Sequence, residues 1–219
     1  MATAHPRTRV YIDGFNLYYA AFRRSRFGAY KWLDPVALCE AALPRNDIDL
    51  VRYFTAPLNP SRGRTAQRAR QVTYLGALHT LPRLSIHFGE FVEHAKRLLL
   101  VEPPHGGPSF ARVWVPEEKG SDVNLASHLL VDGFLGAYDV AVVVSNDADL
   151  LEPVRLVRKV LGLPVGVLKV EGGQRACVFA NVGSFIKPLR RAHFERAQLP
   201  PVVCDSSGGL WRKPAEWGR

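Results

Sequence analysis

The segment that most constrains the fold of this chain is Asp139–Leu150, with the sequence DVAVVVSNDADL. No polar residue interrupts its apolar run, Val140–Val144, which is typical of a strand buried on both faces of a parallel sheet. After the polar turn, apolar residues recur with helical spacing at Leu150, Val154, Val157 and Leu161. A buried strand, a polar turn and an amphipathic helix together form the βα unit of an α/β fold.

The rest of the chain repeats this alternation of strands and helices. We predict further strands at residues 10–13, 49–56, 84–91, 164–168 and 184–186, and helices near residues 17–22, 35–43, 65–81 and 121–134. This alternation predicts a three-layer α/β/α sandwich with a mainly parallel central sheet and right-handed connections. The carboxyl ends of the first strand and of Val140–Val144 should then lie next to each other, as in doubly wound folds.

Two segments depart from the alternation. Residues 92–118 contain Pro103-Pro104 and Gly106-Gly107, so we expect a small β-hairpin or arm inserted between elements of the sheet. We therefore predict one domain over residues 1–192. Residues 193–219 are rich in Pro, Gly, Ser and Trp, and we expect them to lie on the domain surface, anchored by Trp211 or Trp217.

Composition favours a cytoplasmic protein. The chain has 219 residues, of which 47% are hydrophobic, enough for a single core. No apolar run approaches the roughly 20 residues of a membrane span, and the N-terminus lacks the apolar segment of a signal peptide. The cysteines, Cys39, Cys177 and Cys204, are far apart in the sequence and fit a reducing compartment. We expect no membrane partner.

The charge is strongly basic and unevenly distributed. Lys and Arg number 29 against 20 acidic residues, a net charge of +9. Six arginines and no acid lie between Leu50 and Gly89. Such a charge suggests a polyanionic partner, although for charge alone a solvated basic surface is the safer interpretation.

Four aspartates are predicted to lie along one edge of the sheet. Asp13 follows the first strand, Asp147 and Asp149 follow Val140–Val144, and Asp122 begins a helix. Each one alone is explained as a helix cap or a first-turn acid. Together they would repel one another unless a divalent cation neutralised them, and a set of oxygen ligands suits Mg²⁺ or Mn²⁺. Cation-dependent hydrolysis of a phosphodiester is the resulting hypothesis.

Three motifs carry a family resemblance. YIDGFNLYY (11–19), KGSDVNLASHLL (119–130) and DVAVVVSNDADL (139–150) resemble, in order, the NYN domain family of the PIN-like nuclease superfamily. The resemblance runs from about Arg9 to Ile186. Lys213-Pro214 and Trp217 also resemble the C-terminal end of one bacterial branch. The resemblance to the NYN domain family implies a PIN-like α/β/α fold and ribonuclease chemistry that depends on Mg²⁺ or Mn²⁺.

The resemblance assigns roles to individual residues. Asp13, Asp122 and Asp147 match the metal-binding acids of the family, and Asn16 and Asp149 match further residues of its first and last motifs. At His128 this chain departs from the pattern, because many family members have an aspartate there. That histidine either replaces a metal ligand or is a partly buried helix residue.

Substrate contacts are predicted for Lys119, Asn146, Arg68 and Arg70. Lys119 either pairs with a substrate phosphate or offsets the repulsion between the acids. Asn146 stands where many relatives have glycine, and its amide suits a phosphate contact. The two arginines, with Arg62 and Arg64, either grip a nucleic-acid backbone or form a solvated basic face.

We therefore expect a metal-dependent ribonuclease acting on RNA, with single-stranded RNA as the preferred partner. A catalytically weak or inactive RNA-binding module of the same family is the alternative, and His128 is the residue that favours it. A sugar-nucleotide transferase that uses Asp147 and Asp149 lacks support, because the chain has neither a second substrate domain nor a glycine-rich diphosphate loop. The sequence is compatible with a homodimer.

Overall fold

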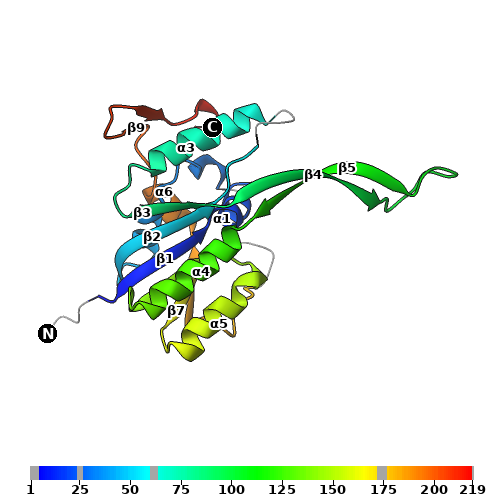
Figure 1. Ribbon diagram of the computed structural model, residues 1–219. Helices are drawn as coiled ribbons and strands as arrows, with labels where there is room; N and C mark the ends of the chain where they lie inside the picture. The colour runs from blue at the N-terminus through cyan, green and yellow to red at the C-terminus, as the bar shows by residue number, and fades with distance from the viewer. Residues whose placement is uncertain (1–4, 24–26, 60–63, 172–176, 219) are drawn as a thin grey trace.

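A central sheet of six parallel strands organises the molecule (Figure 1). The computed structural model describes residues 5–23, 27–59, 64–171 and 177–218. The strands of this sheet, in spatial order, are β3 (Leu84–Phe88), β2 (Asp47–Thr55), β1 (Arg7–Asp13), β6 (Val140–Val144), β7 (Val165–Val170) and β8 (Phe185–Leu189). β1 and β6 are neighbours in parallel register, with Ile12 opposite Val144. The predicted parallel sheet is confirmed, and the carboxyl ends of its two central strands are adjacent.

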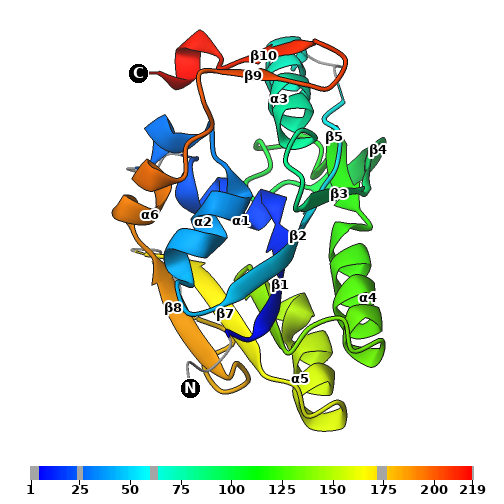
Figure 2. The ribbon, with the colours of Figure 1, turned by 90° about the vertical axis from the view of Figure 1, so that its left-hand side faces the viewer.

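Helices cover both faces of the sheet (Figures 1 and 2). One face carries α1 (Gly14–Ala21), α2 (Pro35–Ala42), α3 (Thr65–Leu78) and α6 (Arg191–Arg196), and the other carries α4 (Ser121–Phe134) and α5 (Leu151–Val160). Side chains of a strand point alternately to opposite faces. Val142 therefore packs into the core of the first face and Val143 into that of the second. No helix of the described residues has the length and apolarity to cross a membrane.

A two-stranded antiparallel ribbon projects from the body of the molecule (Figure 1). It consists of β4 (Glu90–Leu99) and β5 (Phe110–Lys119), and we call it the arm. The hairpin was predicted, but its strands extend beyond residues 92–118 at both ends. β3 stops at Phe88 because Gly89 turns the chain into the arm. A Cβ at Gly89 would lie 2.5 Å from the carbonyl oxygen of Lys119, so the base of the arm is tightly packed.

The C-terminal segment packs across α2 and α3 (Figure 2). The ring of Phe194 in α6 is buried and stacks on Phe27 at 4.9 Å between centroids. A short hairpin of β9 (Val202–Cys204) and β10 (Leu210–Arg212) follows, and η3 (Ala215–Trp217) ends the segment. The Trp211 ring lies so close to Gly76 that a Cβ there would approach it to 2.5 Å. The segment thus contributes to the core as well as covering its surface.

Candidate functional site

Asp13 lies at the carboxyl end of β1, where it caps α1. Its Oδ1 accepts a hydrogen bond from the backbone N–H of Asn16 at 2.9 Å, and its Oδ2 accepts one from Ser145 Oγ at 3.0 Å. The residue is only 6% exposed. Burial raises the pKa of this carboxyl, the two hydrogen bonds oppose the rise, and the charges of Asp147 and Glu118 add to it. Asp13 is therefore both the cap of α1 and a desolvated acid beside other acids.

Asp147 and Asp149 follow β6 in the turn that leads to η2 (Ala148–Leu150). The Asp147 side chain caps η2 by accepting the N–H of Asp149 at 3.0 Å. The N–H of Asp147 donates to Ser145 Oγ at 3.1 Å, so one hydroxyl bridges Asp13 and the backbone of Asp147. Asp149 is exposed in the first turn of η2. The structure thus gives Asp13 and Asp147 the expected capping roles within the same acidic cluster.

Two asparagines tie the turn after β6 to its surroundings. Asn16 Oδ1 accepts the backbone N–H of Asn146 at 3.1 Å, and Asn146 Oδ1 accepts the N–H of Val178 at 3.1 Å. The first bond links α1 to the turn that carries Asp147. Asn16 and Asn146 therefore help to fix the turn that carries Asp147, in addition to lying beside its carboxylate.

Asp122 in the first turn of α4 lies in the same electrostatic environment. Its pKa is raised to about 6 by burial and by the charges of Asp13, Asp147, Glu118 and Asp149. The charges of the other four acids therefore act on the Asp122 carboxyl. The β1 and β6 edge and the N-terminus of α4 thus bring together all four aspartates predicted from the sequence.

Glu118 is a fifth acid at this site, and the sequence analysis missed it. It lies near the end of β5 and caps α4 by accepting the Ser121 N–H at 3.1 Å and the Ser121 Oγ–H at 2.6 Å. In the sequence it belongs to the run Glu117-Glu118-Lys119, which resembles an ordinary charged turn. Only its position three residues before Ser121 hints at a cap. We call the five carboxylates of Asp13, Glu118, Asp122, Asp147 and Asp149 the acidic rim.

The donor chemistry of the acidic rim suits a hard divalent cation. Its ligands are oxygen atoms. The pKa values of Asp13 and Asp122 are raised by burial and also by neighbouring carboxylates, and a cation would favour the charged form of both groups. Among the described residues, no three His, Cys, Asp or Glu side chains are already arranged to hold an ion.

His128 lies in a different environment on α4. Its ring packs 4.1 Å from that of His87 and 5.8 Å from that of Phe54, measured between centroids. The charges acting on it are those of Arg52 and Asp132, which pair with each other at 2.8 Å. Burial and the Arg52 charge lower the pKa of His128. The histidine belongs to a cluster between α4 and the strands β2 and β3.

Lys119 lies at the base of the arm beside the acidic rim. Its Nζ is 3.9 Å from Oε2 of Glu117, and its side chain is exposed. Residues alternate between the faces of a strand, so Lys119 and Glu118 point to opposite faces of β5. Glu117, outside the acidic rim, is the acid that Lys119 contacts.

The arginines of α3 all contact other parts of the chain. Arg70 pairs with Glu216 of the C-terminal segment at 3.2 Å, and Arg68 donates to the backbone carbonyl of Leu58. Arg64, immediately before the helix, pairs with Glu93 of the arm at 3.1 Å. Arg62 lies outside the described residues. Arg68 and Arg70 thus help to fix neighbouring segments against α3.

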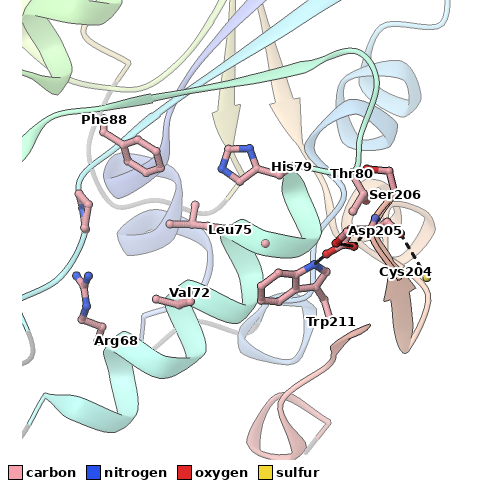
Figure 3. A pocket seen from close by; sticks show the side chains of 13 residues that line it. Arg68, Val72, Leu75, His79, Thr80, Phe88, Cys204, Asp205, Ser206 and Trp211 are labelled. Atoms are coloured by element: carbon pink, nitrogen blue, oxygen red, sulfur yellow. Dashed lines mark hydrogen bonds between the residues drawn. The ribbon is translucent and has the colours of Figure 1, made fainter. Parts of the chain in front are cut away.

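A cavity of about 720 Å³ lies between α3 and the C-terminal segment (Figure 3). Arg68, Val72, His79, Phe88, Asp205 and Trp211 are among the residues that line it. Asp205 holds the Trp211 ring in place by accepting its Nε1–H at 3.0 Å. No member of the acidic rim lines this cavity among the described residues. Phe88 at the end of β3 connects the two regions, since its carbonyl accepts the side-chain amide of Asn124 in α4.

Comparison with known proteins agrees with this architecture. Residues 7–189 match the NYN domain family, which covers the sheet, the arm and the acidic rim. The chain belongs to the NYN domain family. This membership suggests a nuclease-type function, and nucleases of the NYN and PIN-like type typically use divalent metals.

One curated protein and one solved structure are also similar to this chain. The chain is 29% identical to 6-hydroxy-3-succinoylpyridine 3-monooxygenase HspA of Pseudomonas putida (strain DSM 28022 / S16), over 96% of this chain and 75% of that protein. It also resembles the crystal structure of a protein of unknown function from Vibrio parahaemolyticus RIMD 2210633. That match has a TM-score of 0.52 and 12% identity and covers 87% of this chain and 97% of the other. The structural match supports the fold alone.

Proposed function

We propose that this NYN domain is a metal-dependent ribonuclease that hydrolyses phosphodiester bonds of single-stranded RNA at the acidic rim. The observation that carries the proposal is the meeting of acids at the strand ends and at the start of α4. The Ser145 hydroxyl links Asp13 to the backbone of Asp147, and Glu118 caps the helix that carries Asp122. The pKa of Asp122, raised to about 6 by burial and by the charges of four other carboxylates, agrees with this arrangement. Clustered carboxylates at the carboxyl edge of a parallel sheet are expected where an ion or ligand binds. The basic net charge of +9 supports a polyanionic substrate.

Asp13, Asp122 and Asp147 are the residues proposed to hold Mg²⁺ or Mn²⁺. A divalent cation there would supply a Lewis acid for the phosphate oxygens and lower the pKa of a water. The Ser145 hydroxyl links the two positions, because it donates to the Asp13 carboxylate and accepts the backbone N–H of Asp147. Glu118 is proposed as a positioning residue, because it caps the helix that carries Asp122.

The other residues have proposed roles in proton transfer and substrate orientation. Asp149 is exposed at the outer side of the rim, so we assign it the general base that takes a proton from the attacking water. Asn16 orients the turn that carries Asp147. Lys119 and Asn146 are proposed to contact the phosphate next to the cut. Arg68 and Arg70 are proposed to contact the RNA backbone farther away.

The proposal is tested by incubating the protein with single-stranded and double-stranded RNA and DNA in the presence of Mn²⁺, Mg²⁺ or EDTA. We expect cleavage of single-stranded RNA with either cation and none with EDTA. Cleavage that persists after EDTA treatment and dialysis would overturn the metal-dependent mechanism. RNA binding without cleavage under all conditions would instead support an inactive RNA-binding module. The cytoplasm is the proposed location, and light scattering would show whether the chain is a homodimer.

A second candidate function comes from the relative named as a monooxygenase, because the match to it covers 96% of this chain. The cavity lined by Phe88, His79 and Trp211 offers aromatic walls suited to a small aromatic molecule. A monooxygenase places one atom of O₂ in the product and the other in water, using two electrons from a reductant. The test is O₂-dependent oxidation of 6-hydroxy-3-succinoylpyridine with a reduced nicotinamide or flavin. Oxidation that survives loss of the acidic rim would favour this candidate.

A further inference from the structure

The arm has two faces with different side chains. Opposed residues of an antiparallel pair share a face, as do residues two apart on one strand. We define the aromatic face by the cross-strand pairs Leu99–Phe110, Arg97–Arg112, Ala95–Trp114, Glu93–Pro116 and Phe91–Glu118. The contact of the Arg97 guanidinium with the Phe110 ring, 4.5 Å from its centroid, agrees with this assignment.

The aromatic face carries two positive charges directly opposite each other. Arg97 and Arg112 form a cross-strand pair, and like charges in such a pair destabilise a sheet. Within the described part of the chain, neither guanidinium forms an ion pair with a carboxylate. An arrangement that repels internally and is exposed to solvent is stabilised when an anion binds across it.

The basic groups of the opposite face already contact a carboxylate. Glu117 lies at the centre of a network there, and it pairs with Lys96, with His94 at 3.4 Å and with Lys119 at 3.9 Å. The two faces of the arm thus differ. On the opposite face the basic groups pair with a carboxylate, and on the aromatic face the arginines lie beside exposed rings.

The exposed rings of the aromatic face suit unpaired bases. Phe110 is 44% exposed and Trp114 is 53% exposed, and both lie beside the arginine pair. Aromatic rings interleaved with arginines bind single-stranded nucleic acid, because bases stack on the rings and phosphates pair with the guanidinium groups. Paired bases of a duplex are already stacked on each other, so the face favours single strands.

The aromatic face leads to the acidic rim. At the base of the arm, the Phe91 ring contacts that of Phe15, two residues after Asp13, at 5.5 Å between centroids. Glu118, opposite Phe91, is itself a member of the rim. Glu93, the acid between the arginines and the rim, is paired with Arg64. The arginine pair lies six residues outward from Glu118, or about 20 Å at roughly 3.4 Å per residue.

We propose that the aromatic face of the arm binds the single-stranded RNA that is cut at the acidic rim, holding the strand about 20 Å from the site of cleavage. This inference rests on the proposed function and names a binding surface for its substrate. A second copy of the chain is a poorer occupant. An isologous contact through this face would bring four arginines together on a protein whose net charge is already +9.

The test is RNA binding in EDTA, where cleavage is not required. An RNA of about 20 nucleotides is titrated against the wild type, Trp114→Ala, and the double variant Arg97→Gln/Arg112→Gln, at several salt concentrations. The matched control is Arg155→Gln/Lys159→Gln on α5, which removes the same charge elsewhere. Melting curves and light scattering on every variant report folding and oligomeric state.

We expect Trp114→Ala to weaken binding at least about fivefold, as loss of a stacked base does. The arginine double variant should lower the slope of log affinity against log salt by about 1.4, the value for two single-strand phosphate contacts, with a smaller change for the control. Slopes and affinities equal to those of the control would overturn the proposal. A loss of affinity that coincides with dissociation of a dimer would overturn it too, since a second copy would then cover the face.

These outcomes are separate from those of the proposed function. If the wild type binds RNA through the arm but never cleaves it with Mn²⁺, the ribonuclease proposal fails while the RNA-binding face stands. If it cleaves RNA and the arm variants cleave and bind as the control does, the ribonuclease proposal stands and the arm has no part in substrate binding.

Discussion

Single residues at the acidic rim combine local structural roles with a shared charge. Asp13 and Asp147 cap α1 and η2, which is the interpretation that each residue supports alone. The same carboxylates raise the pKa of Asp122 through their charges. Capping explains why an acid or asparagine is tolerated at each position. It does not explain why several carboxylates lie together, and the proposal of a metal site rests on the cluster as a whole.

The raised pKa of Asp122 predicts a pH dependence of stability in the absence of metal. Its folded-state pKa is about 6 and its ordinary value is 3.8, so the folded state binds the proton more tightly. The resulting stabilisation is fully present below about pH 4 and is lost as the pH rises through about 6. Replacing Asp122 with Asn should therefore raise the metal-free melting temperature at pH 7.5 and flatten its change between pH 4 and 7, measured by calorimetry in EDTA.

The control for this prediction is Asp34→Asn. Asp34 caps α2 by accepting the N–H groups of Val36 and Ala37, and Asn is about as good a cap as Asp. This variant should not raise the metal-free melting temperature at pH 7.5. A lower melting temperature for Asp122→Asn at every pH would show that its carboxylate stabilises the fold and that repulsion at the rim is weak.

His128→Asp tests whether this histidine takes part in the reaction. The ring packs on His87, and a carboxylate there would lie near Asp132 and compete for Arg52. We expect a loss of stability of about 1–2 kcal/mol, measured by urea unfolding. Cleavage should stay within about twofold of the wild type, well short of the hundredfold or more lost with a general acid or base. A cleavage rate reduced tenfold or more in a folded protein would instead give His128 a role as ligand or proton carrier.

At the scale of elements, the strands of the buried sheet could be predicted from the sequence. The length of the arm and its packing against other elements could not. Val140–Val144 is an unbroken apolar run, and a strand buried on both faces needs such a run whatever surrounds it. The hairpin could be predicted from its Pro-Pro and Gly-Gly pairs, but not its reach or the contact of its base with α4. Glu118 was missed because its only local signal is a position three residues before Ser121, and its place beside Asp13 and Asp122 depends on how the arm meets α4.

The attachment of the arm to the rim depends on Gly89. A Cβ at this position would meet the carbonyl oxygen of Lys119 at 2.5 Å and the backbone nitrogen of Ser121 at 2.9 Å. Neither atom belongs to a flexible side chain, so Gly89→Ala should cost about 1–3 kcal/mol of stability. Cleavage should fall as well, because the strain acts on the first turn of α4, where Asp122 lies. Urea unfolding and an RNA cleavage assay measure the two effects.

Gly28→Ala provides the comparison, since among the described residues its Cβ would meet the Phe22 carbonyl oxygen alone, at an ordinary contact distance of 3.6 Å. This variant should unfold at or above the wild-type denaturant midpoint. Equal stability and activity for the two alanine variants would mean that the base of the arm can shift without disturbing the rim.

At the scale of the whole molecule, the fold places one acidic centre within a basic chain. The parallel sheet brings the ends of β1 and β6 together, and the arm and α4 add Glu118 and Asp122 from one side. The C-terminal segment packs on α3 through Trp211, and its helix α6 packs on Phe27 through Phe194, where the sequence predicted a surface tail anchored by a tryptophan. Sequence patterns predict which residues are buried within an element. Contacts between distant segments become visible only in the folded chain.

The central claim is that the acidic rim hydrolyses RNA with a divalent cation, and the most direct test is the Mn²⁺-dependent cleavage rate of Asp13→Asn, Asp122→Asn and Asp147→Asn beside Asp34→Asn. Asn preserves the caps and removes a charge that a hard cation requires. Each rim variant should stay folded, bind RNA in EDTA and cleave it at least about a hundredfold more slowly than Asp34→Asn. Three folded rim variants that cleave at the wild-type rate would show that these aspartates are helix caps only and would contradict the ribonuclease assignment.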